Sequence, residues 1–168
     1  MTQHLMLVAA VGALLLAAPS RASADPSAKH GLVAVQYLVG TWNCRHTVGD
    51  FSGTYTTSFS NALDGAWLKQ RYDFPATKTA PAWYGEFFFG YDGRVPRWVR
   101  FGAMSTGQYF GMVSKDAGVA RMTWEYRLPG RGSATWTKRS DREFSIDGPS
   151  YPENGKLVTE HHVCTKSS

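Results

Sequence analysis

The sequence predicts an all-β protein: a closed antiparallel up-and-down barrel of about 8–10 strands, preceded by a short helix. Two observations carry this prediction. Short segments of alternating apolar and polar residues follow one another along most of the chain, and turn residues separate them. The two cysteines, Cys44 and Cys164, fall in the first and the last of these segments. A disulfide needs Cα atoms within roughly 7 Å, so a bond between them would make the end strands neighbours and close the sheet.

The first predicted element is a helix over residues 28–40. Its apolar residues recur at helical spacing and Gly40 ends it; they are Leu32, Val35, Leu38 and Val39. Strands are then predicted over residues 41–48, 51–60, 66–74, 83–91, 97–104, 107–114, 119–127, 133–146 and 157–164. Gly49 and Asp50 predict a tight hairpin, and the stretch 147–156, rich in Gly and Pro, is expected to form the longest late loop.

The first 24 residues are predicted to be a secretory signal peptide. An apolar run extends from Leu5 to Ala18, and the residues 22–24 form a small-x-small cleavage site. The run is shorter than the roughly 20 residues that span a bilayer, and no second segment is apolar enough to do so. We therefore expect residues 25–168 to form one exported domain, periplasmic or extracellular, without a transmembrane segment. The alternative is an uncleaved membrane anchor.

Export places both cysteines in an oxidising environment, which favours the Cys44–Cys164 bond. The alternative is a pair of free or intermolecular thiols. The formal net charge of +5 falls to +4 without the leader, whose one charged residue is Arg21. Basic and aromatic residues interleave in residues 93–101 and 121–139, as in nucleic-acid-binding proteins. The basic residues are spread rather than clustered, so we interpret them as a solvated outer face and expect no nucleic-acid partner.

The residues "LVGTW", which open the first strand after the helix, resemble the calycin superfamily, which includes lipocalins, fatty-acid-binding proteins and nitrobindin-like proteins. The segment "GEFFFGYDGRVPRWVRF" resembles the middle of a family of small bacterial proteins of unknown function with the same kind of barrel. The resemblance implies a barrel with a ligand cavity. It also implies that Trp42 points inward and plugs one end.

Two histidines on the inner face are candidates for a metal or ligand site. If Trp42 points inward, so does His46, because strand side chains alternate. If Cys44 lies opposite Cys164, His46 lies opposite His162, and the two imidazoles could share a divalent metal, with Glu160 as a third ligand. The alternative is a hydrogen-bonded histidine pair without metal.

A haem site is a further alternative. Nitrobindin-like barrels bind haem through a histidine near the chain end, which corresponds to His162 here. They also carry Gly-x-Trp-x-Gly-x-Gly at the start, and this chain replaces both later glycines with Cys44 and His46. That substitution counts against haem, because glycine lets a flat ligand approach the backbone.

Aromatic residues on the expected inner face predict an apolar pocket with phenol groups that orient a ligand. The candidate lining residues are Tyr55, Gln70, Tyr72, Tyr109, Trp124 and Tyr126, together with Phe51, Phe59 and Leu68. Gln70 is notable because a buried amide needs hydrogen-bond partners. The alternative is an interior that side chains fill completely.

The sequence contains none of the common catalytic motifs, such as GxSxG, HExxH or CxxC. We therefore expect an exported barrel that binds a small, mostly apolar ligand. Enzymatic activity is left open, and a binding protein is favoured over an enzyme. A haem or metal protein and an envelope interaction protein with a filled barrel remain as alternatives.

Overall fold

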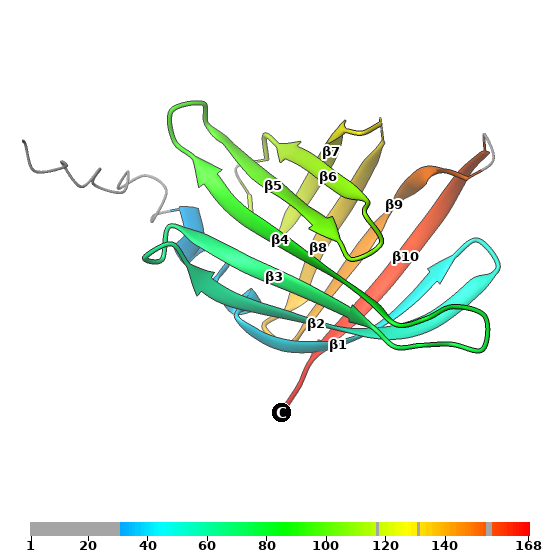
Figure 1. The fold of residues 1–168 in the computed structure, drawn as a ribbon. Helices are drawn as coiled ribbons and strands as arrows, with labels where there is room; N and C mark the ends of the chain where they lie inside the picture. Colours follow the sequence, from blue (N-terminus) through cyan, green and yellow to red (C-terminus); the bar gives the residue numbers. More distant parts are fainter. Residues whose placement is uncertain (1–30, 117, 131, 154–155) are drawn as a thin grey trace, which may run out of the picture.

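The computed structural model describes residues 31–116, 118–130, 132–153 and 156–168, and the predicted leader lies outside this part of the chain. The fold is a closed barrel of ten antiparallel strands, as the sequence predicts (Figure 1). The strands are β1 (Gly40–Val48), β2 (Phe51–Ala62), β3 (Trp67–Phe74), β4 (Trp83–Asp92), β5 (Arg97–Met104), β6 (Tyr109–Ser114), β7 (Arg121–Leu128), β8 (Ser133–Ser140), β9 (Glu143–Glu153) and β10 (Lys156–Lys166). No helix in the described part of the chain is long and apolar enough to cross a membrane.

Each strand pairs with its neighbours in sequence, and β1 pairs with β10 to close the barrel. The seam has the predicted register: Cys44 lies opposite Cys164 and forms the disulfide, and His46 lies opposite His162. The bond spans 120 residues of sequence. Restricting the unfolded chain over such a distance is worth about 4–5 kcal/mol in the chain-entropy account.

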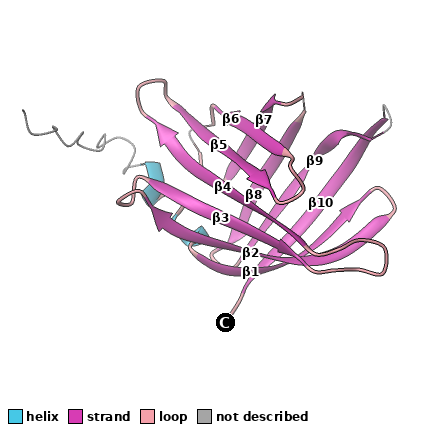
Figure 2. Ribbon diagram, in the orientation of Figure 1, coloured by secondary structure: helices cyan, strands magenta, loops and turns pink. Residues whose placement is uncertain are grey.

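The predicted helix is shorter than expected. Residues 31–33 have α-helical geometry and a 3-10 turn, η1, covers Gln36–Leu38, while Ala28 to His30 lie outside the described residues. Gly40 is the first residue of β1 and has a φ of 122°, which glycine adopts without the steric cost other residues incur. The helical segment that precedes Gly40 lies at one end of the barrel (Figure 2). Its side chains Leu32, Val35 and Leu38 are buried there.

The prediction for the last third of the chain was wrong in two places. Residues 141–142 form a turn, so that the stretch 133–146 contains two strands instead of one. The expected loop 147–156 is mostly the extended β9–β10 hairpin. Its prolines are tolerated because β9 pairs with β8 only as far as Asp147, so that beyond this residue one edge of β9 needs no N–H donors.

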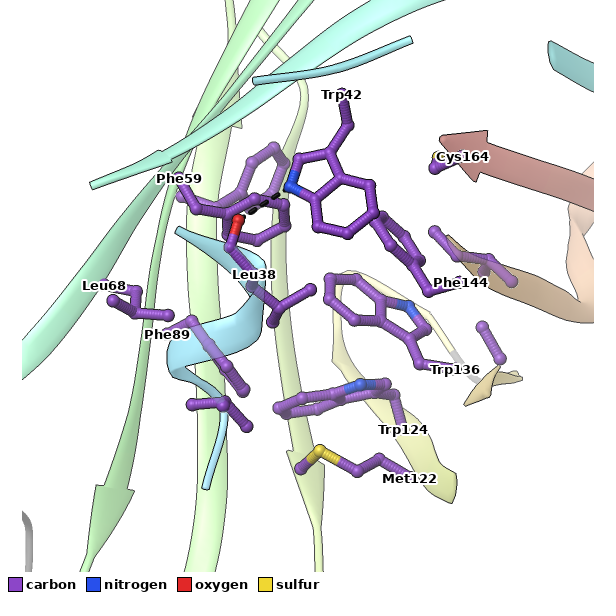
Figure 3. Packing of buried hydrophobic residues seen from close by; sticks show 14 of the residues in the cluster. Leu38, Trp42, Phe59, Leu68, Phe89, Met122, Trp124, Trp136, Phe144 and Cys164 are labelled. Carbon is purple, nitrogen blue, oxygen red and sulfur yellow. Dashed lines mark hydrogen bonds between the residues drawn. The ribbon is translucent and has the colours of Figure 1, made fainter. Parts of the chain in front are cut away.

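One half of the barrel interior is filled with apolar side chains and is called the closed half below. Trp42 points into it, and its indole Nε1 donates to the carbonyl oxygen of Leu38 at 2.7 Å (Figure 3). This confirms that Trp42 faces inward. The rings that pack around it and beneath it are Phe59, Phe89, Trp98, Trp124, Trp136 and Phe144. The helical segment and these rings close this end, so access to the interior lies at the other end, where β1 and β3 finish.

Candidate functional site

The other half of the interior, called the open half below, contains polar side chains. Period two along β3 points Gln70 and Tyr72 inward, between Leu68 and Phe74. The same alternation along β5 points Arg100 inward, on the same face as Trp98. The third group of polar side chains comes from the seam, where β1 supplies His46 and β10 supplies His162 and Glu160.

Arg100 is the most unusual of these residues. Its side chain is 4% exposed, although arginine is almost never fully buried unless it is paired. Its Nε donates to Gln70 Oε1 at 3.1 Å, one terminal nitrogen donates to the Tyr72 hydroxyl at 3.0 Å, and the other contacts the Met112 sulfur at 3.3 Å. The guanidinium also lies 4.1 Å from the ring centroid of Phe87, a cation–π contact.

The partners of Gln70 extend this network toward the backbone. Gln70 Nε2 donates to Thr57 Oγ1 at 3.2 Å, and that hydroxyl donates to the carbonyl oxygen of Arg71 at 2.9 Å. Both Gln70 and Thr57 are buried. The chain of bonds satisfies the buried amide that the sequence singled out and holds the Arg100 guanidinium in one orientation.

A cavity of about 100 Å³ lies directly beside Arg100 in the open half. At about 30 Å³ for each water molecule in the liquid, it has room for roughly three water molecules. Aromatic and thioether side chains form most of its wall, and Arg100, Tyr72, Glu160 and His162 supply the polar atoms. The remaining lining residues are Phe74, Trp83, Phe87, Met104, Phe110, Met112, Tyr126, Ala134, Trp136 and Ile146.

A second group of hydrogen-bonded polar side chains lies at the cavity wall and comes from β2 and β10, the two strands that flank β1. The Tyr55 hydroxyl lies 2.8 Å from Nδ1 of His162, and Nε2 of His162 lies 3.2 Å from a carboxylate oxygen of Glu160. When the ring donates from Nε2 to this carboxylate, Nδ1 accepts the Tyr55 proton. Burial holds the pKa of Tyr55 well above its usual value, and the same cause raises the pKa of Tyr72. Both phenols are therefore neutral hydrogen-bonding groups.

His46 lies at the end of this group inside a box of rings. The ring centroids of Phe51, Tyr55, Phe74 and His162 are 5.4–5.6 Å from its own. Burial lowers the pKa of His46, nearby His162 lowers it further, and Glu160 opposes them by raising it. Its Nδ1 is buried and has no hydrogen-bond partner among the described residues.

The geometry of His46 and His162 does not fit the metal site that the sequence offered as a candidate. No group of three or more His, Cys, Asp or Glu side chains in the described part of the chain is arranged to hold a metal ion. Both ring nitrogens of His162 are engaged in hydrogen bonds. Glu160, the expected third ligand, is one of those hydrogen-bond partners.

Haem fits no better. His162 has no ring nitrogen free of a hydrogen bond to serve as an axial ligand. The cavity beside it, at about 100 Å³, is also far below the roughly 300–1,000 Å³ of pockets that hold drug-sized molecules, and haem is larger than most of these.

The residues predicted to line the pocket lie at different places in the structure. Tyr72 and Tyr126 line the cavity. Gln70 and Tyr55 do not line the cavity themselves. Gln70 accepts a hydrogen bond from Arg100, and Tyr55 is hydrogen-bonded to His162, and both of these partners line the cavity. Trp124 is completely buried in the closed half against Phe89 and Trp136 and does not reach the cavity.

The prediction for Tyr109 was wrong. This side chain is 53% exposed and lies on the outer face, while Phe110 takes the inner position. Phe51, also expected inside, is 51% exposed at the open rim, where it contacts His46.

The sequence-based interpretation missed Arg100 by treating all basic residues of the segment 93–101 as solvated. A signal was present: Arg100 follows Trp98 by two residues and therefore shares its face. A cation on the inward face of a strand was the cue for a polar site in the barrel.

Outside the barrel, a wider groove of about 820 Å³ runs over the outer faces of β1 and β2 and beneath the β3–β4 connection. Outward-facing polar side chains form part of its wall, namely Asn43, Arg45, Thr54, Thr56, Asp73 and Thr165. The rest of the wall is mostly apolar or aromatic: Cys44, Tyr55, Phe74, Pro75, Ala82, Trp83, Tyr84 and Val163. The buried Tyr55 borders this groove, whereas Arg100, His162 and Glu160 line the internal cavity instead. The candidate site is therefore the smaller internal cavity, where these charged and imidazole groups converge.

The architecture therefore defines a class: a closed ten-stranded antiparallel barrel with one apolar end and one polar internal site. The chain matches no family model and no curated protein. Among solved structures it is similar to a redesigned β-barrel, with 13% sequence identity, a TM-score of 0.45, and coverage of 80% of this chain and 96% of that one. A likeness of this degree carries no argument about function.

Proposed function

We propose that the protein is an exported β-barrel that binds a small, mostly apolar ligand in the open half of its interior. The observation that carries this proposal is the cavity at the unplugged end, with mainly aromatic walls and a few converging polar groups. This combination is typical of small-molecule sites. The resemblance of "LVGTW" and the following strands to calycins supports the same reading.

The cavity limits the size of the ligand. A volume of about 100 Å³ suits a molecule of a few non-hydrogen atoms in its enclosed part, and any larger portion would extend toward the rim at Phe74 and Trp83. The aromatic walls supply burial of apolar surface, worth roughly 25 cal/mol per Å². The polar groups supply orientation.

Export rests on two features that agree. The leader over residues 1–24 has the pattern of a secretory signal, and the seam holds a disulfide, which persists in oxidising compartments. Periplasmic and extracellular locations both fit.

The proposal is tested by native mass spectrometry of the protein expressed with its leader in a bacterial host and purified from the periplasm. We expect a native mass above the denatured mass by the mass of a small organic molecule. The denatured mass will lie two hydrogens below the reduced mass, because of the Cys44–Cys164 bond. A denatured mass that includes residues 1–24 would contradict the export prediction.

A matched pair of variants locates the ligand. Ala134→Leu places a larger side chain in the cavity wall, whereas Thr135→Leu makes a similar change on the outer face one residue later. We expect Ala134→Leu to remove the mass excess and Thr135→Leu to keep it, with both variants folded by near-UV circular dichroism. Equal native and denatured masses for the wild-type protein, also after incubation with small aromatic molecules, would contradict the proposed function.

One observation favours an interaction protein as the second candidate. Aromatic residues gather on the outer face of β3 to β5, where Phe101 is 46% exposed and its ring contacts those of Trp67 and Phe88. Tyr84, at the start of β4, is 45% exposed. The same native spectrum separates this candidate, because a dimer without a mass excess would favour association through this face.

A further inference from the structure

We propose that the ligand is an organic acid, and that its carboxylate is held by the guanidinium of Arg100 and the hydroxyl of Tyr72. This inference rests on the proposed function and names the chemistry of the ligand. It follows from the charge, the burial and the unused donors of Arg100.

Arg100 is a buried cation without a counter-charge among the side chains that the structure describes. Its three acceptors, the Gln70 amide oxygen, the Tyr72 hydroxyl and the Met112 sulfur, are all neutral. No carboxylate of the described residues lies within 4.0 Å of its nitrogens. Burying an unpaired charge is costly unless a charge partner and hydrogen bonds compensate. The cavity wall at Arg100 is thus arranged for an anion that the described residues do not supply.

Glu160 is the carboxylate that lines the same cavity, and it does not take this role. Its oxygen lies 3.2 Å from Nε2 of His162, and this contact holds it at the seam. Both residues line the cavity, and no ion pair within 4.0 Å joins Glu160 to Arg100. An incoming carboxylate is therefore attracted to the Arg100 guanidinium.

Arg100 has donors to spare for such a group. A guanidinium has five N–H groups, and three of them have an acceptor among the described residues. The Tyr72 hydroxyl accepts from Arg100, interacts with the Gln70 side chain and lines the cavity beside the guanidinium, within reach of the same ligand group. The planar fork of arginine matches a carboxylate in two parallel hydrogen bonds. The contacts with Gln70 and Phe87 fix the plane of that fork before a ligand arrives.

The remainder of the ligand is mostly apolar, because most of the other lining side chains are apolar or aromatic. Met104, Phe110, Tyr126 and Phe74 are among them. An aromatic or short aliphatic acid places its charged end at Arg100 and its body against these side chains.

Benzoate and benzamide form a matched pair of probes, since they have the same shape and differ in charge. Isothermal titration calorimetry with each probe at pH 7 measures the contribution of the charge. We expect benzoate to bind at least about tenfold more tightly than benzamide, and added salt to weaken benzoate binding only modestly, because buried charges are poorly screened.

The variant Arg100→Met removes the buried cation, and Arg97→Met removes an equal charge from the same strand without lying on the cavity wall. We expect Arg100→Met to lose at least about tenfold in benzoate affinity and Arg97→Met to stay within about twofold of the wild type. Should Arg100→Met fail to fold, Arg100→Lys keeps the charge and removes the fork, and its benzoate affinity is expected to fall several-fold.

Three results would overturn the inference. Equal affinity for benzoate and benzamide would leave the proposed cavity standing and remove the acid-specific role of Arg100. Equal loss of benzoate affinity in Arg97→Met and Arg100→Met would assign the effect to net charge. Inorganic phosphate that binds as tightly as benzoate would make the site a general anion site without preference for an apolar body. Failure of the proposed function itself is distinct, because it appears as the absence of a mass excess in the native spectrum.

Discussion

The two halves of the barrel interior are built on the same strands and from opposite kinds of side chain. The closed half holds Trp42, Phe89, Trp124 and other rings in contact with one another. A few residues further along the same strands, the open half holds Arg100, Gln70 and a histidine pair around a cavity. β5 contains this change in two inward positions, from Trp98 to Arg100.

The difference separates the side chains that stabilise the fold from the side chains that form the proposed binding site. Burial of the rings in the closed half is favourable in itself. Burial of Arg100 in the open half is unfavourable in itself, and a well-packed apolar side chain of similar volume is often as stable or more stable in such a place. The closed half has its own imperfection, since the Trp124 indole N–H is buried without a partner among the described residues. That imperfection is a single neutral donor, whereas the open half buries a charge.

The largest expected effect tests the structural role of the closed half. Trp42→Ala removes a completely buried ring and its hydrogen bond to Leu38, and we expect the free energy of unfolding in urea to fall by about 3–5 kcal/mol. Trp83→Ala removes a partly exposed ring at the open rim that stacks on Phe74 at 3.8 Å. Its expected loss is about 1–2 kcal/mol. Equal losses for the two variants would break the contrast between the halves.

An intermediate effect concerns pH and the open half. The pKa of His46 is lowered from 6.5, chiefly by burial. The unfolded chain therefore binds a proton at higher pH than the folded protein, and His46 contributes stability that is present above pH 6.5 and is lost as the pH falls toward its lowered folded pKa. The variant His46→Phe keeps an aromatic ring at this position and removes the titrating group. When the pH falls from 7 to below 6.5, we expect its free energy of unfolding to fall by less than that of the wild type.

The measurement is urea unfolding at several pH values for both proteins, because the difference between the two curves removes the contribution of the other titrating groups. Parallel curves would contradict the buried, neutral state of His46.

The smallest effect sharpens the assignment of inner and outer faces. Tyr109 is half exposed on β6, so Tyr109→Ala is expected to change the free energy of unfolding by no more than about 0.5 kcal/mol. It is also expected to leave benzoate binding unchanged in calorimetry. A tenfold loss of benzoate affinity in this variant would contradict the outer position of Tyr109 and indicate that it lines the cavity.

The fold followed from the sequence because two independent patterns agreed. Period-two alternation identified most of the strands, and the cysteines at the two ends fixed the seam, including the pairing of His46 with His162. β6 shows where alternation fails: its residues are aromatic or apolar on both faces, so Tyr109 and Phe110 were equally acceptable inside. The β9–β10 hairpin was missed because its prolines and glycine resemble a loop and are tolerated only where one strand edge is unpaired.

The site was less predictable than the fold for a physical reason. Arg100 and Gln70 are thirty residues apart in sequence, and the pairing of both β3 and β5 with β4 brings them to 3.1 Å. The sequence could flag Gln70 as a buried amide and could not supply its partner. The cavity is likewise a sum of many side-chain volumes from different strands, which no local pattern reports.

The contrast between the two halves is tested most directly by one NMR titration. In ¹H–¹⁵N spectra, the buried Arg100 Nε–H, which donates to Gln70, reports on the open half, and the Trp42 indole N–H, which donates to Leu38, reports on the closed half. We expect benzoate to shift the Arg100 signal strongly, benzamide to shift it weakly, and neither to move the Trp42 signal. Equal shifts of both signals, or a shift confined to Trp42, would contradict the assignment of structure to one half and binding to the other.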